Sequence, residues 1–443
     1  MVQKRASDSR QNRTCPRGPF ARWSPASIPL DSLAFLLITL LIGGLSAYGD
    51  EVSADRSKTH RQGDLTRRTY AGDVKAAFRS NIIQADSAVA TSSSDQYRFY
   101  QNVRFADERY TVRANHLVYY TASGVARLFG DVTLSDGDRR LTADRVSYES
   151  ISGRLSARGD VSAARGDLKL TADRWYKQAT PGVSSAGGSV HYVQVSADTL
   201  EVMADSTVVD DRYRFLSSVE VRQGAWSGSA DQAIITDGER ILMTDQATLR
   251  RDLDSTRTVS SSAQSILLTL AETVVSEAVM SDSVLVVFAS RADTTSRSTI
   301  AADSSYLAFE ETTVSALEAY GAAEISVATG GSSSVVGGST VQVTFSDDHP
   351  EHVLINGEGT LHHQAGDGSL TVTITGTGIR VTLTDDALRS VTADSNAVCE
   401  IEGEHPTRLS GDRLRLEFED GKMRLSEVEG KVKGRYWFED ETR

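Results

Sequence analysis

"LTADRVSYESISGRLSARGDV", residues 141–161, decides the fold because the chain repeats this phrase at a fixed interval. An Ala-Asp step opens the phrase, and copies of the step lie 29 residues apart at Ala85-Asp86, Ala114-Asn115, Ala143-Asp144 and Ala172-Asp173. A valine near its end keeps the same interval at Val103, Val132 and Val161. Two anchors that share one period of 20 to 50 residues indicate a repeat architecture.

Each repeat predicts a pair of β-strands. In "VARLFGDVTL", residues 125–134, Leu128 and Val132 share one face with Gly130 and Leu134, while Phe129 points to the other face. In the next strand the apolar phase changes by one residue at Asp144-Arg145. Because a one-residue slip would turn every later side chain to the other face, we expect a bulge or corner there.

The composition supports an all-β chain. Ser, Thr, Asp and Val are abundant among the 443 residues, and there are only 7 Pro. β-branched residues favour strands, and Ser, Asp and Gly favour turns. Units of 29 residues cannot bury their apolar faces alone, so we expect them to stack into one elongated array of antiparallel strands. Beyond Lys177 the copies of the phrase become irregular.

The N-terminus predicts export. Six Lys and Arg residues precede the apolar run Leu33–Leu45, and a small-residue site follows at Ala47-Tyr48-Gly49. Thirteen helical residues span about 20 Å, which is less than a bilayer core of about 30 Å, so cleavage is expected. An uncleaved inner-membrane anchor is the alternative. Both predict a periplasmic protein.

Charge and cysteine content exclude several classes. Residues 1–50 contribute +3 to the net charge of −13, which leaves −16 for residues 51–443. Such an acidic chain is unsuited to bind nucleic acid. Cys399 is the one cysteine after residue 50, so no internal disulfide is expected, and we interpret it as a buried strand residue.

These phrases, with "IIQADSAV" at 82–89 and "SGDRLRLEFEDGKMRLSEVEGKVKG" at 410–434, resemble the OstA-like family. The family includes LptA, LptC and the N-terminal domain of LptD, which act in lipopolysaccharide transport. The resemblance covers about Ala85–Tyr176 and Gly411–Gly434. It implies an elongated OstA-like β-jellyroll, or β-taco, that shields lipid A acyl chains. It also implies partners among other jellyroll proteins of the transport bridge by edge-strand addition, or head-to-tail self-association.

The chain divides into seven expected segments. They are a signal peptide or anchor at 1–50, a linker at 51–63, regular OstA-like repeats at 64–180, a flexible linker at 181–190, degenerate repeats at 191–327, a Gly/Ser-rich break at 328–340, and C-terminal OstA-like repeats at 341–443. Nothing resembles the membrane barrel that ends the translocon proteins of the family.

Inward-facing apolar residues are the candidate lining of a lipid groove: Val103, Leu128, Val132, Leu141, Val146, Tyr148 and Val161. The alternative is an ordinary sheet core without a ligand, in an exported structural or adhesive β-solenoid. A third hypothesis, a β-helical polysaccharide-acting enzyme, needs two close carboxylates in a cleft, and no pair stands out. We therefore expect a non-enzymatic lipid-transport bridge.

Neither a catalytic nor a cofactor motif is recognisable. The chain contains no G-x-S-x-G elbow, P-loop or dinucleotide fingerprint. His349, His352, His362 and His363 lie close in sequence, but the first pair falls in the acidic stretch "SDDHPEH", which favours a solvated loop over a zinc site. No metal and no cofactor are expected.

Overall fold

The computed structural model describes residues 51–436 except for 180–181, 197, 237, 254, 272–273, 292–295, 311–312, 330, 347, 385, 404–405 and 420–421. Every described residue lies in one compact unit, which spans residues 50–443. The expected export signal lies outside the described residues.

The described residues form strands joined by turns. In chain order the strands are β1 (Glu51–Ser53), β2 (Arg56–Gln62), β3 (Leu65–Phe78), β4 (Asn81–Thr91), β5 (Gln96–Ala106), β6 (Thr111–Tyr120), β7 (Val125–Asp136), β8 (Arg139–Glu149), β9 (Leu155–Arg165), β10 (Leu168–Lys177), β11 (Ser184–Gln194), β12 (Leu200–Val209), β13 (Tyr213–Gln223), β14 (Trp226–Thr236), β15 (Arg240–Asp252), β16 (Arg257–Ala271), β17 (Val274–Ser290), β18 (Arg297–Glu310), β19 (Thr313–Thr329), β20 (Ser332–Ser346), β21 (His349–Gln364), β22 (Thr371–Thr384), β23 (Ala387–Glu402), β24 (Thr407–Gly411), β25 (Arg413–Glu419), β26 (Lys422–Glu429) and β27 (Lys433–Tyr436).

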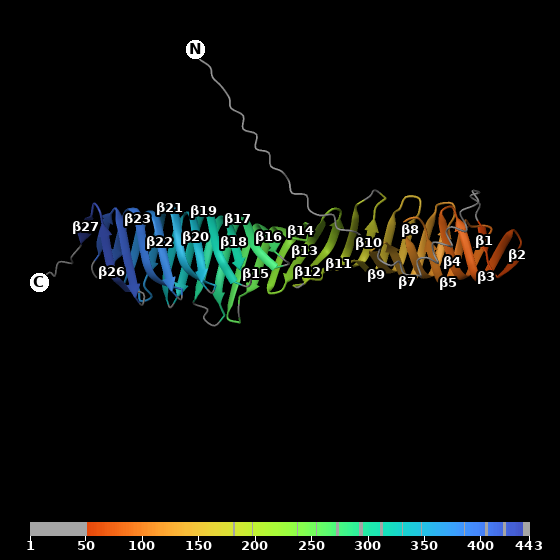
Figure 1. The fold of residues 1–443 in the computed structure, drawn as a ribbon, viewed down its shortest axis with the longest axis horizontal. Helices are drawn as coiled ribbons and strands as arrows, with labels where there is room; N and C mark the ends of the chain where they lie inside the picture. The colour runs from red at the N-terminus through yellow and green to blue at the C-terminus, as the bar shows by residue number, and fades with distance from the viewer. Residues whose placement is uncertain are drawn as a thin grey trace, which may run out of the picture. The chain divides into compact units, whose positions relative to one another are not determined.

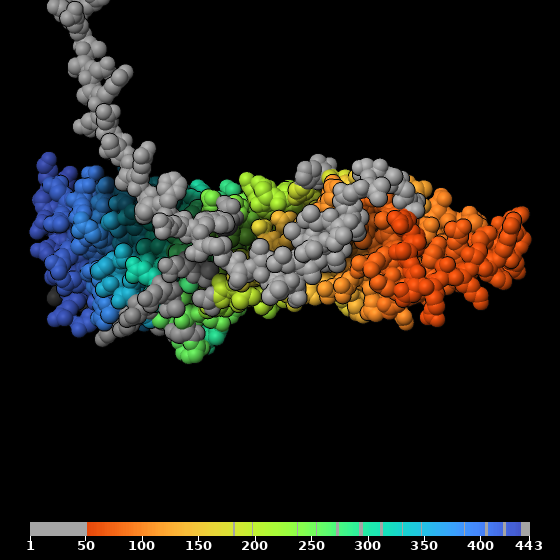
Figure 2. All heavy atoms as spheres, turned by 45° about the vertical axis from the view of Figure 1, so that its right-hand side comes forward, coloured from red at the N-terminus to blue at the C-terminus, as the bar shows by residue number. Residues whose placement is uncertain are grey.

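Neighbouring strands pair in an antiparallel ladder. From β2 to β24 each strand pairs with the next one in the chain, as β7 does with β8 and β8 with β9. At the C-terminal end β23 also pairs with β25, and β24 pairs with β27. The ribbon follows this ladder strand by strand (Figure 1), and the colours of the described residues succeed one another in the same order on the surface (Figure 2). The expected all-β stack of antiparallel strands is confirmed.

A bulge divides the repeat strands into two halves. The register between β8 and β9 breaks between Thr142 and Arg145. Ala143 and Val146 on either side of the break are buried, whereas Asp144 and Arg145 are exposed. The predicted corner at Asp144-Arg145 is therefore confirmed, and it keeps inward residues inward. In β7 the corner residues are Gly130 and Asp131. The sequence predicts Gly130 on the inner face, but in the structure it belongs to the bulge.

The corners define two arms of the stack. Arm A contains the strand halves that lead to turns such as 107–110, 137–138 and 166–167, and arm B contains the halves that lead to turns such as 92–95, 121–124 and 150–154. Side chains of both arms meet in the interior, as the ring contact between Phe105 of arm A and Tyr148 of arm B shows. The interior therefore lies between the two arms.

The backbone conformation of the corners repeats with the sequence. Left-handed residues open the corners of the odd strands β3 to β13 at intervals of 29 residues: Gly72, Gln101, Gly130, Gly159, Gly188 and Ser217. The regular geometry thus continues past residue 180, where the Ala-Asp phrase loses its spacing. In the next unit Ala204-Asp205 forms the step inside β12, while Asp198 lies in the preceding turn. From β16 to β23 the strands lengthen to 14–17 residues, and the period lengthens accordingly.

Three expected linkers contain strands. Residues 51–63 include β1 and β2, residues 181–190 include the first seven residues of β11, and residues 328–340 include the end of β19 and much of β20. The glycines that suggested a flexible linker at 181–190 have a structural position, because Gly188 forms the corner of β11. Gly and Ser in these segments therefore serve tight corners within strands.

The core consists of two adjoining clusters. One contains buried residues from Val74 to Val161, and the other contains residues from Leu170 to Phe418. Trp175 of β10 is half-buried and packs against both clusters. The side chain of Trp175 thus connects the two parts of the interior at the β9–β10 boundary.

Candidate functional site

All seven predicted groove residues lie in the interior. Each is at most 7% exposed, and all belong to the cluster between Val74 and Val161: Val103, Leu128, Val132, Leu141, Val146, Tyr148 and Val161. Leu128 and Val146 are direct cross-strand neighbours. The structure thus brings the predicted residues together in a packed interior, and their role as a lipid lining stays a prediction.

Outward residues confirm the expected strand phase. Phe129 lies next to the inward Leu128 and is half-exposed. Its ring stacks on the outward ring of His116, with 5.5 Å between centroids, and His116 stacks in turn on Tyr100 at 4.6 Å. These three rings lie at the corners of successive strands. Phe129 therefore marks a position on the outer face that is adjacent in the chain to an interior residue.

Aromatic rings join the two arms along the edge of the interior. Phe78 at the end of β3 stacks on Tyr119 at the end of β6, with 5.1 Å between centroids. Tyr148 at the end of β8 contacts Phe105 at 6.0 Å and Tyr110 at 5.1 Å, both with edge-to-face geometry. Such pairs add about 0.5–1.5 kcal/mol each beyond the burial of area. We call this row of contacts between arm A and arm B the aromatic seam.

Hydrogen bonds reinforce the seam between β3 and β10. The Asn81 side-chain amide donates to the Tyr119 hydroxyl at 2.7 Å. The Tyr148 hydroxyl donates to a carboxylate oxygen of Asp107 at 2.5 Å. The Lys177 ammonium donates to the Tyr110 hydroxyl at 2.7 Å. In each pair one partner belongs to arm A and the other to arm B. These bonds therefore hold the two arms together along the edge of the interior.

Asp107 is held in position by its own turn. Its second carboxylate oxygen accepts hydrogen bonds from the backbone N–H groups of Arg109 and Tyr110, at 2.9 and 2.7 Å. Burial, together with the hydrogen bond to Asp107, raises the pKa of Tyr148 well above its ordinary value. The hydroxyl of Tyr148 therefore keeps its proton and remains a donor to the Asp107 carboxylate.

The seam continues in the longer strands. Trp226 contacts Phe309 at 4.7 Å, and Phe288 contacts Phe345 at 5.0 Å. The guanidinium carbon of Arg251 lies 4.9 Å from the ring centroid of Trp226 and 5.7 Å from that of Phe309. Rings and one cation thus close the interior in this region as well.

The sequence contains a pattern that matches the aromatic seam. Phe, Tyr and Asn cluster at the ends of the expected strands, as in "FRSN" at 78–81 and "LVYY" at 117–120. Strand alternation assigns such residues to a face, but it does not say which distant turn they meet. Asn81 and Tyr119 are 38 residues apart, and only the stacking of arms brings them together.

The histidines and the cysteine have separate places. His349, His352, His362 and His363 lie in strand β21 and not in a solvated loop, because the acidic stretch leads into the strand. His363 is buried beside Ser334, and His349 lies 3.2 Å from Asp386. Among the described residues no group of three or more His, Cys, Asp or Glu is arranged to hold a metal ion. Cys399 is a buried free thiol in β23, as predicted.

No helix long and apolar enough to cross a membrane occurs among the described residues.

Comparisons with known proteins place this architecture in a family. A family model described as LptA/(LptD N-terminal domain) LPS transport protein matches residues 141–272. A second model, described as OstA-like protein, matches residues 51–159. No curated protein matches the chain. Through residues 51–272, which the two models cover together, the chain belongs to the OstA-like family.

A solved structure is also similar to part of the chain. It is LptH of Pseudomonas aeruginosa, described as the LptA homologous periplasmic component of the conserved lipopolysaccharide transport device. The two are 19% identical, and the match covers 22% of this chain and 73% of that chain, with a TM-score of 0.21. The family models, and not this local similarity, carry the assignment.

Proposed function

We propose that this chain is a periplasmic lipopolysaccharide-transport protein that shields acyl chains between its two arms on the way to the outer membrane. The observation that carries the proposal is the match of residues 51–272 to two models of this family. Neither model describes an enzyme, and the proposed work requires no bond to be made or broken.

The apolar interior supports the shielding role. Inward positions of arm A and arm B supply Leu, Val and aromatic side chains from β3 to β9 in one cluster. An acyl chain transferred from water to such a surface gains about 0.8 kcal/mol for each buried methylene. A long interior lined in this way would therefore hold a saturated chain of ten or more carbons strongly against return to water.

Lipid entry requires the aromatic seam to open. The lining residues are packed. Three side-chain hydrogen bonds also hold the arms together: Asn81 with Tyr119, Tyr148 with Asp107, and Lys177 with Tyr110. An acyl chain that enters between the arms displaces these side-chain contacts while the backbone ladder of each arm stays intact. The lipid then replaces aromatic contacts with its own, so the two states differ by side-chain rearrangement.

The ends of the strand ladder support association with other jellyroll proteins. β2 pairs only with β3, and β26 pairs only with β25, among the described strands. An unpaired strand edge accepts a strand from another chain by backbone hydrogen bonding. A bridge built by such additions, either with other transport proteins or with copies of this chain, would continue the interior from one member to the next.

A second function is favoured by one observation. The interior is filled by its own side chains, with the seven candidate positions at most 7% exposed. A filled interior is what a structural β-stack without a lipid requires. This alternative predicts that no inward position contacts lipid in the cell.

Photo-crosslinking in cells separates the two functions. A photoreactive residue replaces Leu128 or Val146, which are cross-strand neighbours in the interior, and adducts are probed for lipopolysaccharide. Shielding predicts adducts from both inward positions. The matched control is Phe129, the adjacent residue on the outer face, which should give none. An exported, folded protein without adducts at the inward positions would leave the structural function.

A further inference from the structure

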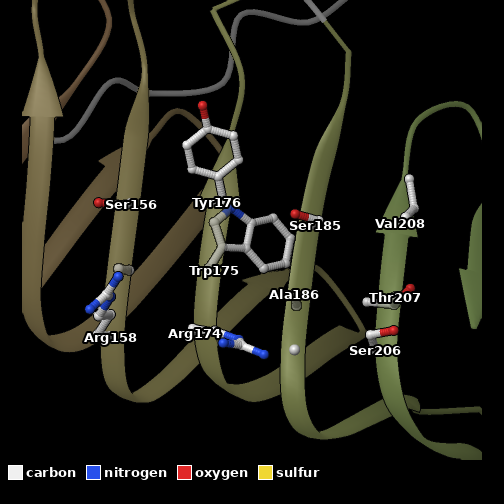
Figure 3. A pocket seen from close by; sticks show the side chains of 12 residues that line it. Ser156, Arg158, Arg174, Trp175, Tyr176, Ser185, Ala186, Ser206, Thr207 and Val208 are labelled. Atoms are coloured by element: carbon white, nitrogen blue, oxygen red, sulfur yellow. The ribbon is translucent and has the colours of Figure 1, made fainter. Parts of the chain in front are cut away.

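The outer face of arm B contains a hollow of about 340 Å³ on strands β9 to β12. Its polar lining comes from residues that alternate with the buried Ala157 and Ala186 and therefore point outward: Ser156, Arg158, Arg174, Tyr176, Ser185 and Ser206. Figure 3 shows these side chains on adjacent strands, with Arg158 and Arg174 at one end and Tyr176 at the other. Ala157, Trp175, Ala186 and Thr207 also line the hollow, and Trp175 packs against both core clusters.

Three arginines form a cross-strand row at this place. Arg145 of β8 pairs with Arg158 of β9, and Arg158 pairs with Arg174 of β10. All three are exposed, and none forms an ion pair with another described residue. Like charges directly opposite each other destabilise a sheet. Repulsion among the three guanidinium groups therefore destabilises this place, and a bound external anion would reduce it.

Small residues leave room for an anion beside the arginines. The Arg174 guanidinium lies beside Gly187, its cross-strand neighbour on β11, where a β-carbon would lie 3.1 Å from its Nε. Ser185 on the same strand and Ser206 on β12 add hydroxyl donors. Guanidinium groups bind phosphate oxygens in a fork with two parallel hydrogen bonds, and hydroxyls complete the set.

The charge of the chain is unevenly distributed in a way that fits an anion here. Residues 51–180 contain 21 Lys and Arg against 16 Asp and Glu, a net charge of +5. Residues 181–443 contain 20 Lys and Arg against 41 Asp and Glu, a net charge of −21. The hollow lies at the end of the basic segment. An anion is therefore drawn to this part of an otherwise acidic protein.

We propose that the hollow binds a phosphate group through Arg158 and Arg174, with Arg145 adding charge. Tyr176 is 41% exposed at the far end of the hollow and offers a flat face on which a sugar ring can pack. The ligand class is thus a phosphate, either free or carried by a saccharide. This site goes beyond the proposed transport function, because its arginine side chains are exposed and its ligand needs no acyl chain.

Calorimetric titration of the full chain tests the site. Inorganic pyrophosphate and glucose 1-phosphate are titrated at constant ionic strength into the wild type and into the double variant R158Q/R174Q. The site predicts saturable binding that weakens at least tenfold in the double variant. Because both arginines are exposed, the variant should fold, and its unfolding midpoint should stay equal or rise as repulsion is removed.

The matched control is R104Q/R113Q. Arg104 and Arg113 are also exposed cross-strand neighbours, on β5 and β6, but they do not line the hollow. This variant removes the same charge and should change binding less than twofold. Equal weakening in both double variants would show attraction by charge alone and would overturn the site, as would the absence of saturable binding in the wild type.

Tyr176 distinguishes the two sources of phosphate. If a saccharide occupies the hollow, Y176A weakens glucose 1-phosphate several-fold and leaves pyrophosphate unchanged. If the ligand is free phosphate, Y176A changes neither. Photo-crosslinking of lipid at Leu128 and Val146 is independent of this result, so failure of the outer site and failure of the transport function are separate outcomes.

Discussion

The carboxylate of Asp144 occupies the space where a side chain on Gly159 would begin. Asp144 lies at the corner of β8, and Gly159 opens the corner of the next strand in a left-handed conformation with φ of 77°. Asp173 and Gly188 repeat the arrangement one unit later. In the previous unit Asn115 replaces the aspartate, with its Nδ2 atom 2.8 Å from the β-carbon position on Gly130. The repeated Ala-Asp and Gly steps are thus two sides of one contact.

This contact predicts the effect of Gly159→Ala. Alanine there would adopt an unfavourable left-handed conformation and collide with Asp144, and we expect a loss of about 2–4 kcal/mol in the free energy of unfolding. Gly166→Ala is the control, because Gly166 is also left-handed, at φ of 55°, but has no atom near its β-carbon position. It should lose only about 1–2 kcal/mol. Urea unfolding measures both, and equal losses would show that Asp144 yields without cost.

The aromatic seam predicts a difference between two buried tyrosines. Tyr148→Phe removes the hydrogen bond to Asp107 across the arms and should cost about 1.5–3 kcal/mol, because the acceptor is a charged group. Tyr192→Phe is the control, since among the described residues the Tyr192 hydroxyl bonds only to Gln194, on its own strand, at 3.1 Å. It should cost about 1 kcal/mol or less. Hydrogen exchange should show faster opening of turns 107–110 and 150–154 in Tyr148→Phe alone.

If lipid enters through the seam, the same variant has a second consequence. Tyr148→Phe should load lipid faster than the wild type while Tyr192→Phe should not, because only the first loosens a contact between the arms. Photo-adduct yield from Val146 at short exposure would measure the loading. An unchanged yield in Tyr148→Phe would indicate that lipid enters elsewhere, such as at an end of the stack.

The sequence determines the repeat and its inward faces more readily than the contacts between arms. Two-residue alternation and the phase change at Asp144-Arg145 suffice to place Leu128 and Val146 inward and Phe129 outward. The period is local as well, since each corner depends on residues about 15 positions apart, such as Asp144 and Gly159.

The hydrogen bonds between the two arms and the outer hollow could not be predicted from strand alternation and the repeat. Asn81–Tyr119 and Asp107–Tyr148 join residues 38 and 41 positions apart, so they depend on how one unit stacks against others. The arginine row depends on register between three strands. Glycine and serine at 181–190 are also ambiguous, because they are the residue types of both a strand corner and a flexible linker.

Cys399 predicts a pH dependence of stability. Burial raises the pKa of its thiol from an ordinary value near 9 to about 12, with a smaller contribution from Glu400. Because the folded pKa is the higher one, this contribution to stability is complete below about pH 9 and is lost as the pH rises toward 12. Cys399→Ala should flatten the alkaline decline in the urea midpoint over this interval. In a Cys15→Ser background the native thiol should not react with a disulfide reagent at pH 8, and rapid reaction without unfolding would contradict its burial.

Arg251 predicts that a buried charge in the seam is not required for stability. The side chain is 3% exposed between Trp226 and Phe309, and its Nε and Nη1 atoms have no hydrogen-bond partner among the described residues. Burial lowers the pKa of the guanidinium, while the charge of nearby Asp348 opposes this shift. Arg251→Met keeps the volume between the rings and removes the desolvated charge, so the free energy of unfolding should stay equal or rise by about 1 kcal/mol.

Arg251→Ala supplies the contrast, because it leaves a gap between Trp226 and Phe309 and should cost about 2–4 kcal/mol. Urea unfolding of the two variants separates volume from charge. If Arg251→Met loses as much as Arg251→Ala, the attraction between Arg251 and Asp348 outweighs the cost of burying the cation. In that case Asp348→Asn in the wild-type background should show a similar loss, since it would leave the same cation without its counter-charge.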